Sequence, residues 1–587
     1  MEKENRHIEK HLSDKELLTA NIGAPACWAF SIAVNAIIAI AIFRLSEIYY
    51  ETNDDYSIAC KIVEGYPFIG FVNYYYCSLL IPVQRLITSL NVFVLSQIVA
   101  SFFSFIVLFK IIVERKKDVV YLSLNALLIA FFSFDHYSSI QFTKTAALLM
   151  CVGLIVIADA YIYQKRFPSY ILGYLLFFTG TCYRQMGMFP ALAYILGFML
   201  IWWAINGKDF FAEKRASNAI AVVLIIVAML IAPYGFDKLS DAKNASTPEL
   251  SLAREYQAER IKITDYPLLD YYDQLSEEYE KVGISENDLI TIDRFILDYD
   301  GAASLENLKV INSINSSVVS SEMTVKKATK RFCRNAIKSI TKRNFTGIHL
   351  LILAVLSMVT VFCTKPRTWA YVVAFALISA TLYITIYYMQ RVNYRAFYVA
   401  DVSAAFWLVY VLATEETKWE SNSRRWIKRS AYIIAIVLIA ALFPREITLL
   451  DAKATHNNNS VASTAIEDYL KEHKDHFYIM PTSIQKWPRL YLQPLKMPYM
   501  QDNCTNTGGW ETMTPSRMDF MANHGVSNPI KDLIDNPQLL LFGKYKTEVF
   551  LEYYNKWYGS ENRSISFEKV DEVDGIEIFK VISIDRD

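Results

Sequence analysis

The chain has 587 residues, of which 53% are hydrophobic and 14% aromatic, and its formal net charge at pH 7 is zero. This composition is more apolar than that of a typical soluble domain, and the balanced charge gives no bulk attraction to nucleic acid. The eight cysteines are scattered without CxxC spacing, which argues against a zinc site or a disulfide framework. Apolar runs of about 18 residues or more recur along the chain, so the sequence predicts a multi-pass membrane protein.

In chain order, a polar and charged segment at residues 1–24 comes before the first apolar run, and we expect it to lie in the cytoplasm. The apolar runs predict a helical transmembrane domain over residues 25–446, because in lipid the backbone amides of a spanning segment must be satisfied within the protein. About eleven spans are expected. They are residues 25–43, 92–113, 118–134, 142–162, 168–183, 188–205, 216–235, 347–363, 369–388, 400–414 and 430–444.

The short connections between these spans predict how the protein lies in the membrane. Every second connection is rich in lysine and arginine, and such loops stay in the cytoplasm. They are ERKKD at 114–118, QKRF at 164–167, KDFFAEKR at 208–215, CTKPRT at 363–368 and KWESNSRRWIKR at 418–429. This assignment places the N-terminus inside, and it places the long loop at 236–346 and the tail at 447–587 outside.

Residues 44–91 form the first outer loop in this topology. The segment at 66–90 is apolar, but it contains prolines and Arg85, so we interpret it as one or two helices that lie along the membrane interface. Near the start of the loop, the sequence NDDY places two carboxylates, Asp54 and Asp55, side by side just outside the first span.

The two long outer regions have different patterns. The loop at 236–346 contains stretches with helical apolar spacing, such as TPELSLAREYQAERI and ENDLITIDRFILDY. The tail at 447–587 predicts a small α/β domain, with HFYIM as a strand and YKTEVFLEYYNKWYG as an amphipathic helix. In ISFEKVDEVDGIEIFKVI the Asp-Gly pair predicts a β-hairpin. The expected fold is therefore mainly α, a transmembrane bundle with an outer helical loop and a C-terminal α/β domain.

This layout resembles the GT-C superfamily of membrane glycosyltransferases. Its members have an acidic motif early in a large first outer loop, a long outer loop after the seventh helix and often a soluble outer C-terminal domain. Here NDDY occupies the acidic position, and residues 44–91 and 236–346 correspond to the two loops. NDDYSIACKIVEG and GISENDL are also similar to bacterial members that act in the synthesis of cell-envelope polysaccharides. The resemblance implies inverting transfer of a sugar from a polyprenyl-phosphate donor to a glycan or lipid-linked acceptor, on the outer face of a bacterial plasma membrane.

Such a transfer needs a base that takes the proton of the acceptor hydroxyl. A carboxylate at the membrane surface can act as this base when its neighbours tune its pKa, and Asp54 and Asp55 are the candidates. An adjacent acid pair can also share a divalent cation such as Mg²⁺, Mn²⁺ or Ca²⁺. The alternative is structural, because Asn-Asp-Asp ahead of an amphipathic helix is an ordinary N-cap. The two roles are compatible.

Arg184, Arg391 and Arg395 fall on short outer loops, against the positive-inside trend. Arginine binds phosphate through two parallel hydrogen bonds and keeps its charge, so these residues are candidates for the donor phosphate, with Arg395 the first choice. The alternative is anchoring at the membrane interface. Lys144, near the start of a predicted span, either binds phosphate as well or extends to the interface.

Asp135 and His136 lie at the next outer turn, where a second acid or a metal ligand is one reading and solvated polar contact is the other. Aromatic side chains, such as the tryptophan in TGGWETM, either stack on sugar rings or belong to a membrane belt or domain core.

Three other classes of function stay open at this point. A glycan polymerase or ligase for lipid-linked oligosaccharides would also use outer arginines, but it would not need an early acid pair. A polysaccharide transporter or flippase is expected to show inverted repeats, broken helices and charges at mid-membrane, and few such charges are evident in the sequence. For a sensor or scaffold the acid pair would be dispensable. The expected partners are the lipid-linked donor, the acceptor and membrane lipid, and no nucleic acid is expected.

Overall fold

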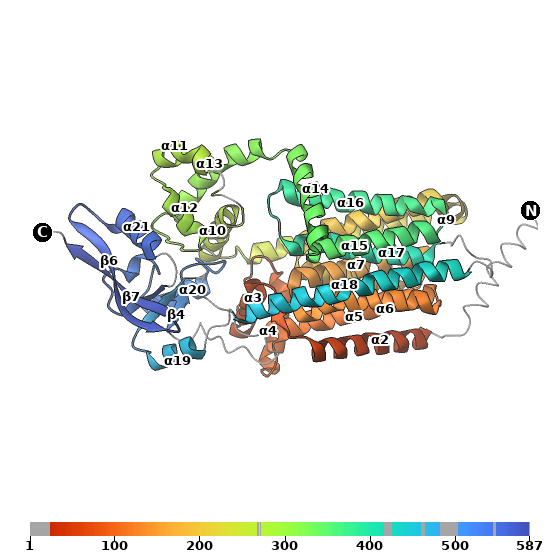
Figure 1. Cartoon of the computed structure of the whole chain (residues 1–587), viewed down its shortest axis with the longest axis horizontal. Helices are drawn as coiled ribbons and strands as arrows, with labels where there is room; N and C mark the ends of the chain where they lie inside the picture. The colour runs from red at the N-terminus through yellow and green to blue at the C-terminus, as the bar shows by residue number, and fades with distance from the viewer. Residues whose placement is uncertain are drawn as a thin grey trace, which may run out of the picture.

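The computed structural model describes residues 24–266, 269, 272–415, 425–459, 464–481, 503–543 and 547–585. The fold is mainly helical. Figure 1 shows long helices that run side by side as a bundle, with a smaller part made of shorter helices and a sheet at one end of it. The predicted combination of a helical bundle with a small C-terminal sheet domain is therefore confirmed.

Nine helices within the described residues are long and apolar enough to cross a membrane. The bundle helices are α2 (Ala24–Leu45), α5 (Val92–Arg115), α6 (Val119–Ser138), α7 (Phe142–Ile162), α8 (Phe167–Tyr183), α9 (Met188–Lys243), α15 (Phe345–Cys363), α16 (Trp369–Tyr388), α17 (Tyr394–Thr414) and α18 (Arg425–Asn459). The count of about eleven spans stays a prediction, because α8 has only 17 residues and the predicted span at 216–235 lies inside α9.

Helix α9 is assigned over 56 residues, but its two ends reach the same place. Near its C-terminal end, Ser240 Oγ accepts a 2.8 Å hydrogen bond from the Tyr74 amide, and Ser240 lines the same cavity as Gln185, which precedes α9. A straight helix of this length would extend about 84 Å. The chain therefore reverses direction within α9, as expected for two separate spans; the side chains at 207–223 lie outside the described residues.

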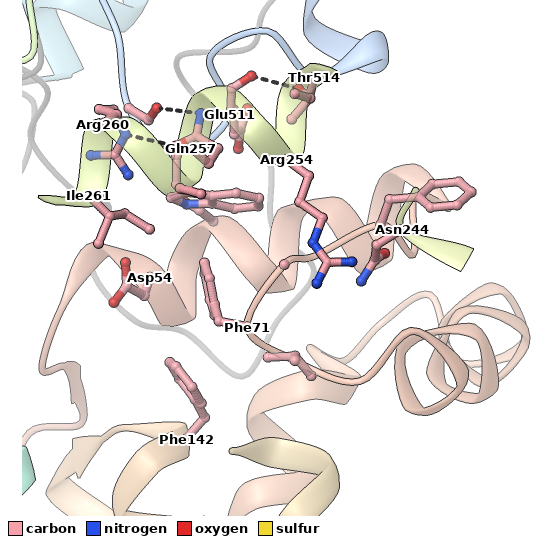
Figure 2. A pocket seen from close by; sticks show the side chains of 18 of the residues that line it. Asp54, Phe71, Phe142, Asn244, Arg254, Gln257, Arg260, Ile261, Glu511 and Thr514 are labelled. Atoms are coloured by element: carbon pink, nitrogen blue, oxygen red, sulfur yellow. Dashed lines mark hydrogen bonds between the residues drawn. The ribbon is translucent and has the colours of Figure 1, made fainter. Parts of the chain in front are cut away.

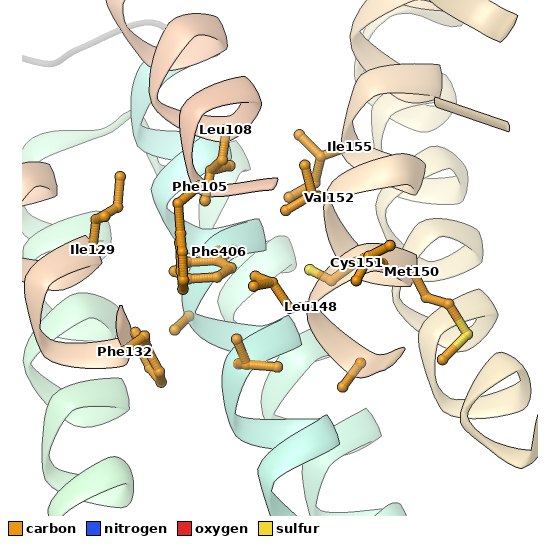
Figure 3. Close-up of a cluster of buried hydrophobic side chains, with 14 of the residues drawn as sticks. Phe105, Leu108, Ile129, Phe132, Leu148, Met150, Cys151, Val152, Ile155 and Phe406 are labelled. Carbon is orange, nitrogen blue, oxygen red and sulfur yellow. The ribbon is translucent and has the colours of Figure 1, made fainter. Parts of the chain in front are cut away.

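The bundle core centres on α7 and α17, whose residues are almost all buried. Figure 3 shows this core, where Phe105 from α5 and Phe132 from α6 meet Phe406 from α17. The ring centroids of Phe105 and Phe406 are 6.2 Å apart, those of Phe132 and Phe406 are 5.1 Å apart, and both pairs are edge-on. Edge-on contact is a favoured arrangement for aromatic rings.

Helices α7 and α8 approach each other closely because glycines face each other where they cross. A Cβ atom on Gly153 would lie 2.5 Å from the carbonyl oxygen of Gly173, and one on Gly173 would lie 2.7 Å from that of Gly153. Small residues allow such backbone contact between membrane helices, where the hydrophobic effect does not drive association. Because α7 begins at Phe142 and Arg184 follows α8, this contact between the two helices also sets the position of Phe142 relative to Arg184.

Two of the basic loops meet at one end of the bundle. Asp159 is buried there and accepts a 2.7 Å hydrogen bond from Arg115 Nε, and its other oxygen lies 2.7 Å from Lys165 Nζ. The connections at 114–118 and 164–167 thus share one end, as the alternating topology expects. The compartment that this end faces stays a prediction.

The opposite end of the bundle carries short elements. Strand β1 (Tyr49–Tyr50) pairs in parallel with β2 (Ser139–Ile140), and it is followed by α3 (Asn53–Glu64) and α4 (Tyr74–Leu86). Helix α4 has 13 residues. Its length of about 20 Å is short of the roughly 30 Å hydrocarbon core.

The long outer loop folds into short helices. They are α10 (Pro248–Thr264), α11 (Tyr272–Lys281), α12 (Glu286–Asp293), α13 (Leu305–Glu322) and α14 (Val325–Lys342). Leu297, which follows α12, belongs to the same hydrophobic cluster as Ile530 and Tyr553 of the C-terminal region. Inside this shared core, Asp298 accepts hydrogen bonds from Asn528 Nδ2 at 2.7 Å and from the Tyr553 hydroxyl at 2.9 Å. The outer loop and the tail therefore form one folded unit, whereas the sequence pattern indicates two separate regions.

The C-terminal sheet has five strands in the order β4-β3-β5-β7-β6, and β3 runs parallel to β4 and β5. Its elements are α19 (Thr464–Glu472), β3 (Phe477–Met480), β4 (Cys504–Asn506), α20 (Pro515–Ala522), β5 (Leu539–Gly543), α21 (Thr547–Tyr558), β6 (Arg563–Val573) and β7 (Ile576–Asp585). Asp574 and Gly575 join β6 to β7 with φ angles of 53° and 69°, as a tight hairpin turn requires. The predicted strand, helix and hairpin of the tail are confirmed.

Candidate functional site

A cavity of about 650 Å³ lies where the bundle meets the outer part. This volume is within the range of small-molecule sites. Its walls come from α3, the segment after α3, the ends of α8 and α9, helix α10, the start of α17 and the loop after β4. Figure 2 shows Asp54, Phe71 and Phe142 on one side of the space, and Gln257 and Arg260 of α10 on the other.

Asp54 faces this cavity from the first turn of α3. Its Oδ2 accepts a 2.9 Å hydrogen bond from Arg395 Nη1, which also lies 3.4 Å from Thr52 Oγ1. Each side chain of the Asp54–Arg395 pair is 24% exposed. The N-cap position belongs to Thr52, so Asp54 is not the capping residue, although an acid in the first turn also favours the helix dipole.

Two more arginines line the cavity beside Asp54. Arg391 forms an ion pair with Asp265. The Arg184 side chain has no hydrogen bond or ion pair within the described part of the chain, and its guanidinium lies 5.9 Å from the centre of the Phe142 ring. Burial lowers the pKa of Arg184 to about 10, and the charges of Arg395 and Arg391 act in the same direction. A half-buried cation with other cations near it is placed where an anion would be stabilised.

Asp55 points away from the cavity into the protein, where it is fully buried. Its Oδ1 accepts hydrogen bonds from the Phe142 amide at 2.9 Å and from Gln97 Nε2 at 3.1 Å. Burial raises the pKa of Asp55 to about 8, and the neighbouring charge of Asp54 adds to this effect. Asp55 therefore joins α3 to α5 and α7, and it is Asp54 that reaches the cavity.

Lys144 does not line the cavity. Its Nζ lies 2.7 Å from Glu51 Oε2 and 3.0 Å from Asp135 Oδ1, and the other Glu51 oxygen lies 3.1 Å from Lys453 Nζ. Burial opposes ionisation of Glu51, but the charges of Lys144 and Lys453 outweigh it and lower the pKa of Glu51 to about 2. This buried ion cluster connects β1 with α6, α7 and α18.

The donor atoms proposed for a metal ion do not fit a shared site. Asp54 and Asp55 face different surroundings, and Asp135 belongs to the ion cluster. His136 is buried, with Nδ1 3.3 Å from Ser101 Oγ. Within the residues that the structure describes, no three His, Cys, Asp or Glu side chains gather around one point. The residues singled out for metal binding thus make other contacts.

An aromatic row forms one wall of the cavity. The Trp510 ring lies edge-on to Phe71 with 5.3 Å between centroids, and Phe71 stacks on Phe142 at 5.7 Å. Trp510 comes from the TGGWETM segment, so one aromatic side chain singled out in the sequence does reach the candidate site. The row extends from the outer part to Phe142, beside Arg184.

Half of the predicted site residues meet in this cavity. Those that line it are Asp54, Arg184, Arg391 and Arg395. Those absent from its described lining are Asp55, Asp135, His136 and Lys144.

Three further arginines, which were not among the predicted site residues, also line the cavity: Arg254 and Arg260 on α10 and Arg517 on α20. In the sequence, arginines on an amphipathic helix are expected on its solvated face, and no local pattern distinguishes these. Every cationic side chain in the described lining is an arginine, the residue suited to binding oxyanions through paired hydrogen bonds.

Comparison of the chain with family models, with curated proteins and with solved structures gives no match.

Proposed function

We propose that the protein is an integral membrane glycosyltransferase of GT-C type, which transfers a sugar from a polyprenyl phosphate to a glycan or lipid-linked acceptor. The observation that carries this proposal is Arg184, a half-buried guanidinium without an ionic partner among the described residues, close to the cavity-facing carboxylate of Asp54. The cation supplies an anion site, the carboxylate supplies a base, and the apolar bundle supplies lipid-facing surface for a polyprenyl chain. The proposed location is a bacterial plasma membrane, with the cavity on the outer face.

In the proposed reaction the acceptor hydroxyl oxygen attacks the anomeric carbon on the face opposite the phosphate. Asp54 takes the hydroxyl proton as the new glycosidic bond forms. The bond between the anomeric carbon and the phosphate oxygen breaks, and its electrons leave with the polyprenyl phosphate. Arg184, Arg391 and Arg395 stabilise the charge that develops on this leaving group. The product is inverted at the anomeric carbon, and Asp54 then returns its proton to water.

The decisive experiment compares Asp54→Asn with the wild type in nanodiscs, with a panel of radiolabelled polyprenyl-phosphate sugars as donors. Asparagine keeps the shape and most hydrogen bonds of aspartate but does not accept the proton, so we expect transfer to fall by roughly 10²–10⁴-fold. Expression and thermal stability should be retained. The matched control is Asp300→Asn, which alters an exposed pair with Lys531 outside the cavity. If Asp54→Asn transfers sugar at the wild-type rate, Asp54 does not act as the base.

A transport function is the second candidate, and one observation favours it. Asp401 in α17 lies 3.2 Å from His349 Nδ1 in α15 and accepts a 2.7 Å hydrogen bond from the Tyr383 hydroxyl. Glu446 in α18 is also buried. Ionisable groups inside membrane helices often serve proton-coupled movement. Reconstituted vesicles that move a lipid-linked glycan across the bilayer without forming a glycosidic bond would support this alternative.

A further inference from the structure

Six arginines and five acidic side chains are among the described residues that line the cavity, and the arginines differ in whether an acid pairs with them. Arg254, Arg391 and Arg395 each have a carboxylate partner. Arg184, Arg260 and Arg517 have none within the described part of the chain. Arg260 and Arg517 are buried and Arg184 is half-buried. A cation held away from water without a direct ion pair is costly, so each of these three positions is suited to an anionic group on a ligand.

Arg260 is 4% exposed and lies on α10, the helix that covers the cavity in Figure 2. Its hydrogen bonds go to neutral oxygens, from Nε to Gln257 Oε1 at 2.7 Å and from Nη1 to Thr264 Oγ1 at 2.9 Å. Gln257 in turn donates a 2.7 Å hydrogen bond to the Thr512 carbonyl. Arg260 is thus held rigidly against the loop that carries Trp510, while its charge stays uncompensated by a direct ion pair.

Arg517 is 2% exposed, lies on α20 and lines the same cavity. Its Nη2 donates a 2.5 Å hydrogen bond to the Asn506 carbonyl, and Nη1 donates to the side chain of Asn506. Its Nε has no hydrogen-bond partner among the described residues. Burial raises the pKa of Tyr256, whereas Arg260 and Arg517 both act to lower it. The two guanidinium groups therefore lie near the same tyrosine.

Asp54 and Asp265 both line the cavity, and the charge of each acts on Arg184 and on Arg260. Asp265 is paired with Arg391, whereas Asp54 is the candidate base. A ligand that is bound at Arg260 and Arg517 would therefore present its other groups to Asp54. In the proposed reaction this is the position of the acceptor, because Asp54 takes the acceptor proton.

We propose that Arg260 and Arg517, with Trp510 beside them, form a second subsite that binds a carboxylate or phosphate group carried by the acceptor glycan. This inference rests on the proposed function, and it narrows the acceptor to an acidic sugar. Trp510 offers an apolar ring in the wall of the same cavity, and its Nε1 has no partner among the described residues. An acidic sugar would bind with its ring against Trp510, its charged group at the two arginines and a hydroxyl towards Asp54.

The experiment measures binding of small probes to the full-length protein in nanodiscs by ligand-observed NMR. The probes are glucuronate and glucose 6-phosphate, with glucose as the neutral match. We expect both acidic probes to bind at least about tenfold more tightly than glucose, because hydrogen bonds between charged groups are stronger than those between neutral groups. Arg260→Gln and Arg517→Gln should each weaken the acidic probes by about tenfold or more, and Arg517→Lys should have an intermediate effect. Equal affinity for all three probes would overturn the proposal.

Three comparisons complete the test. Arg563→Gln is the matched control, because Arg563 pairs with Asp535 outside the cavity, and it should bind the probes as the wild type does. Arg184→Gln should leave glucuronate affinity within about twofold, since this residue serves the donor phosphate. The third comparison measures the binding of inorganic pyrophosphate to Arg184→Gln and to Arg517→Gln. If both variants lose tight binding, the second subsite takes a second phosphate of the donor. This result would overturn the assignment of the subsite to the acceptor.

The two proposals can fail separately. Loss of sugar transfer in Asp54→Asn tests the base, and it does not depend on glucuronate binding. If Arg517→Gln does not fold, Arg260→Gln and Arg517→Lys decide the outcome, since Arg517→Lys keeps the charge and Arg260→Gln leaves the contacts of α20 in place.

Discussion

Arg395 holds Asp54 through a single guanidinium nitrogen, Nη1, at 2.9 Å, and this bond joins two residues that are 341 positions apart in the chain. The other hydrogen bond of Arg395 to a described residue, to Thr52, uses the same nitrogen. Its Nε and Nη2 therefore keep their N–H groups for a ligand. In the proposed enzyme, one guanidinium would touch both the base and the leaving phosphate and fix the distance between them.

This relationship predicts the effect of Arg395→Lys. Lysine keeps the positive charge, but it lacks the planar fork that allows one side chain to hold two groups at once. We expect near-normal stability with at least about tenfold lower kcat/KM for sugar transfer, and a larger loss in Arg395→Gln. Steady-state kinetics in nanodiscs make the comparison. Equal kcat/KM in Arg395→Lys and the wild type would show that the fork is not used.

Asp55 predicts a dependence of stability on pH. Its pKa is about 8 in the folded protein against an ordinary value of 3.8, so between these limits the folded state binds a proton that the unfolded state has lost. The contribution of this group to the free energy of unfolding therefore falls as the pH rises from about 4 to about 8. Asp55→Asn removes the titration and keeps an oxygen for the Phe142 amide. We expect the thermal midpoint of Asp55→Asn, relative to that of the wild type, to rise with pH. A constant difference from pH 5 to pH 8 would contradict the assignment.

The ion cluster around Lys144 predicts a strongly destabilised variant. Glu51→Gln removes the carboxylate that lies between Lys144 and Lys453, leaving two buried or partly buried cations with one acid fewer. Breaking a buried pair costs about 3–5 kcal/mol. The lowered pKa of Glu51 adds a test based on pH. The contribution of Glu51 to the free energy of unfolding is complete above the ordinary pKa of the group, near 4.5, and it is lost as the pH falls towards 2. Asp300→Asn, which breaks an exposed pair, should cost less than about 1 kcal/mol.

The contact between α7 and α8 predicts that Gly153→Ala is harmful although alanine is the better helix former. The new Cβ would lie 2.5 Å from the Gly173 carbonyl oxygen, so the helices must separate, at a cost of about 1–3 kcal/mol. Gly235→Ala is the control, because its Cβ would meet nothing within 4 Å. Thermal midpoints of the two purified variants decide the matter. A stable Gly153→Ala would mean that this crossing is looser than the structure shows.

Cys333 provides a test of membrane orientation in the natural sequence. The structure describes all eight cysteines, and Cys333 alone is exposed. It lies on α14, in the loop that is expected outside. A membrane-impermeant maleimide applied to intact cells should label the wild type but not Cys333→Ser. In the Cys333→Ser background, Arg166→Cys at the opposite end of the bundle should be labelled only after permeabilisation. The reverse pattern would invert the topology.

The bundle could be predicted from the sequence because the thickness of the bilayer sets the length of the apolar run that a spanning helix needs. The Asp-Gly hairpin was equally predictable, since few residue pairs adopt positive φ at both turn positions. Which of Asp54 and Asp55 faces the cavity could not be predicted. Neighbours on a helix point about 100° apart, so one faces the cavity and the other the core, and the sequence does not show which.

Arg260 and Arg517 were missed for a different reason. Their position depends on the packing of the outer loop against the C-terminal region, which joins residues far apart in the chain. The same limit applies to Lys144, whose partners in the folded protein are not evident from the sequence. A lone lysine in an apolar run gives no sign of Glu51 and Asp135, the two acids that neutralise it in the folded protein.

The shared core of the outer loop and the tail has a consequence for how the protein is made. Asp298 and Asn528 are hydrogen-bonded across 230 positions. At a synthesis rate of 5–20 residues per second, the apolar side chains around Leu297 emerge roughly 10–50 s before the strands that cover them. If the loop lies outside, as the topology predicts, these helices wait on the far side of the membrane during this interval with an uncovered apolar surface. This protein should therefore depend more on extracytoplasmic chaperones that bind such surfaces than a protein whose outer loop folds alone. A stop codon before the tail should also harm it more.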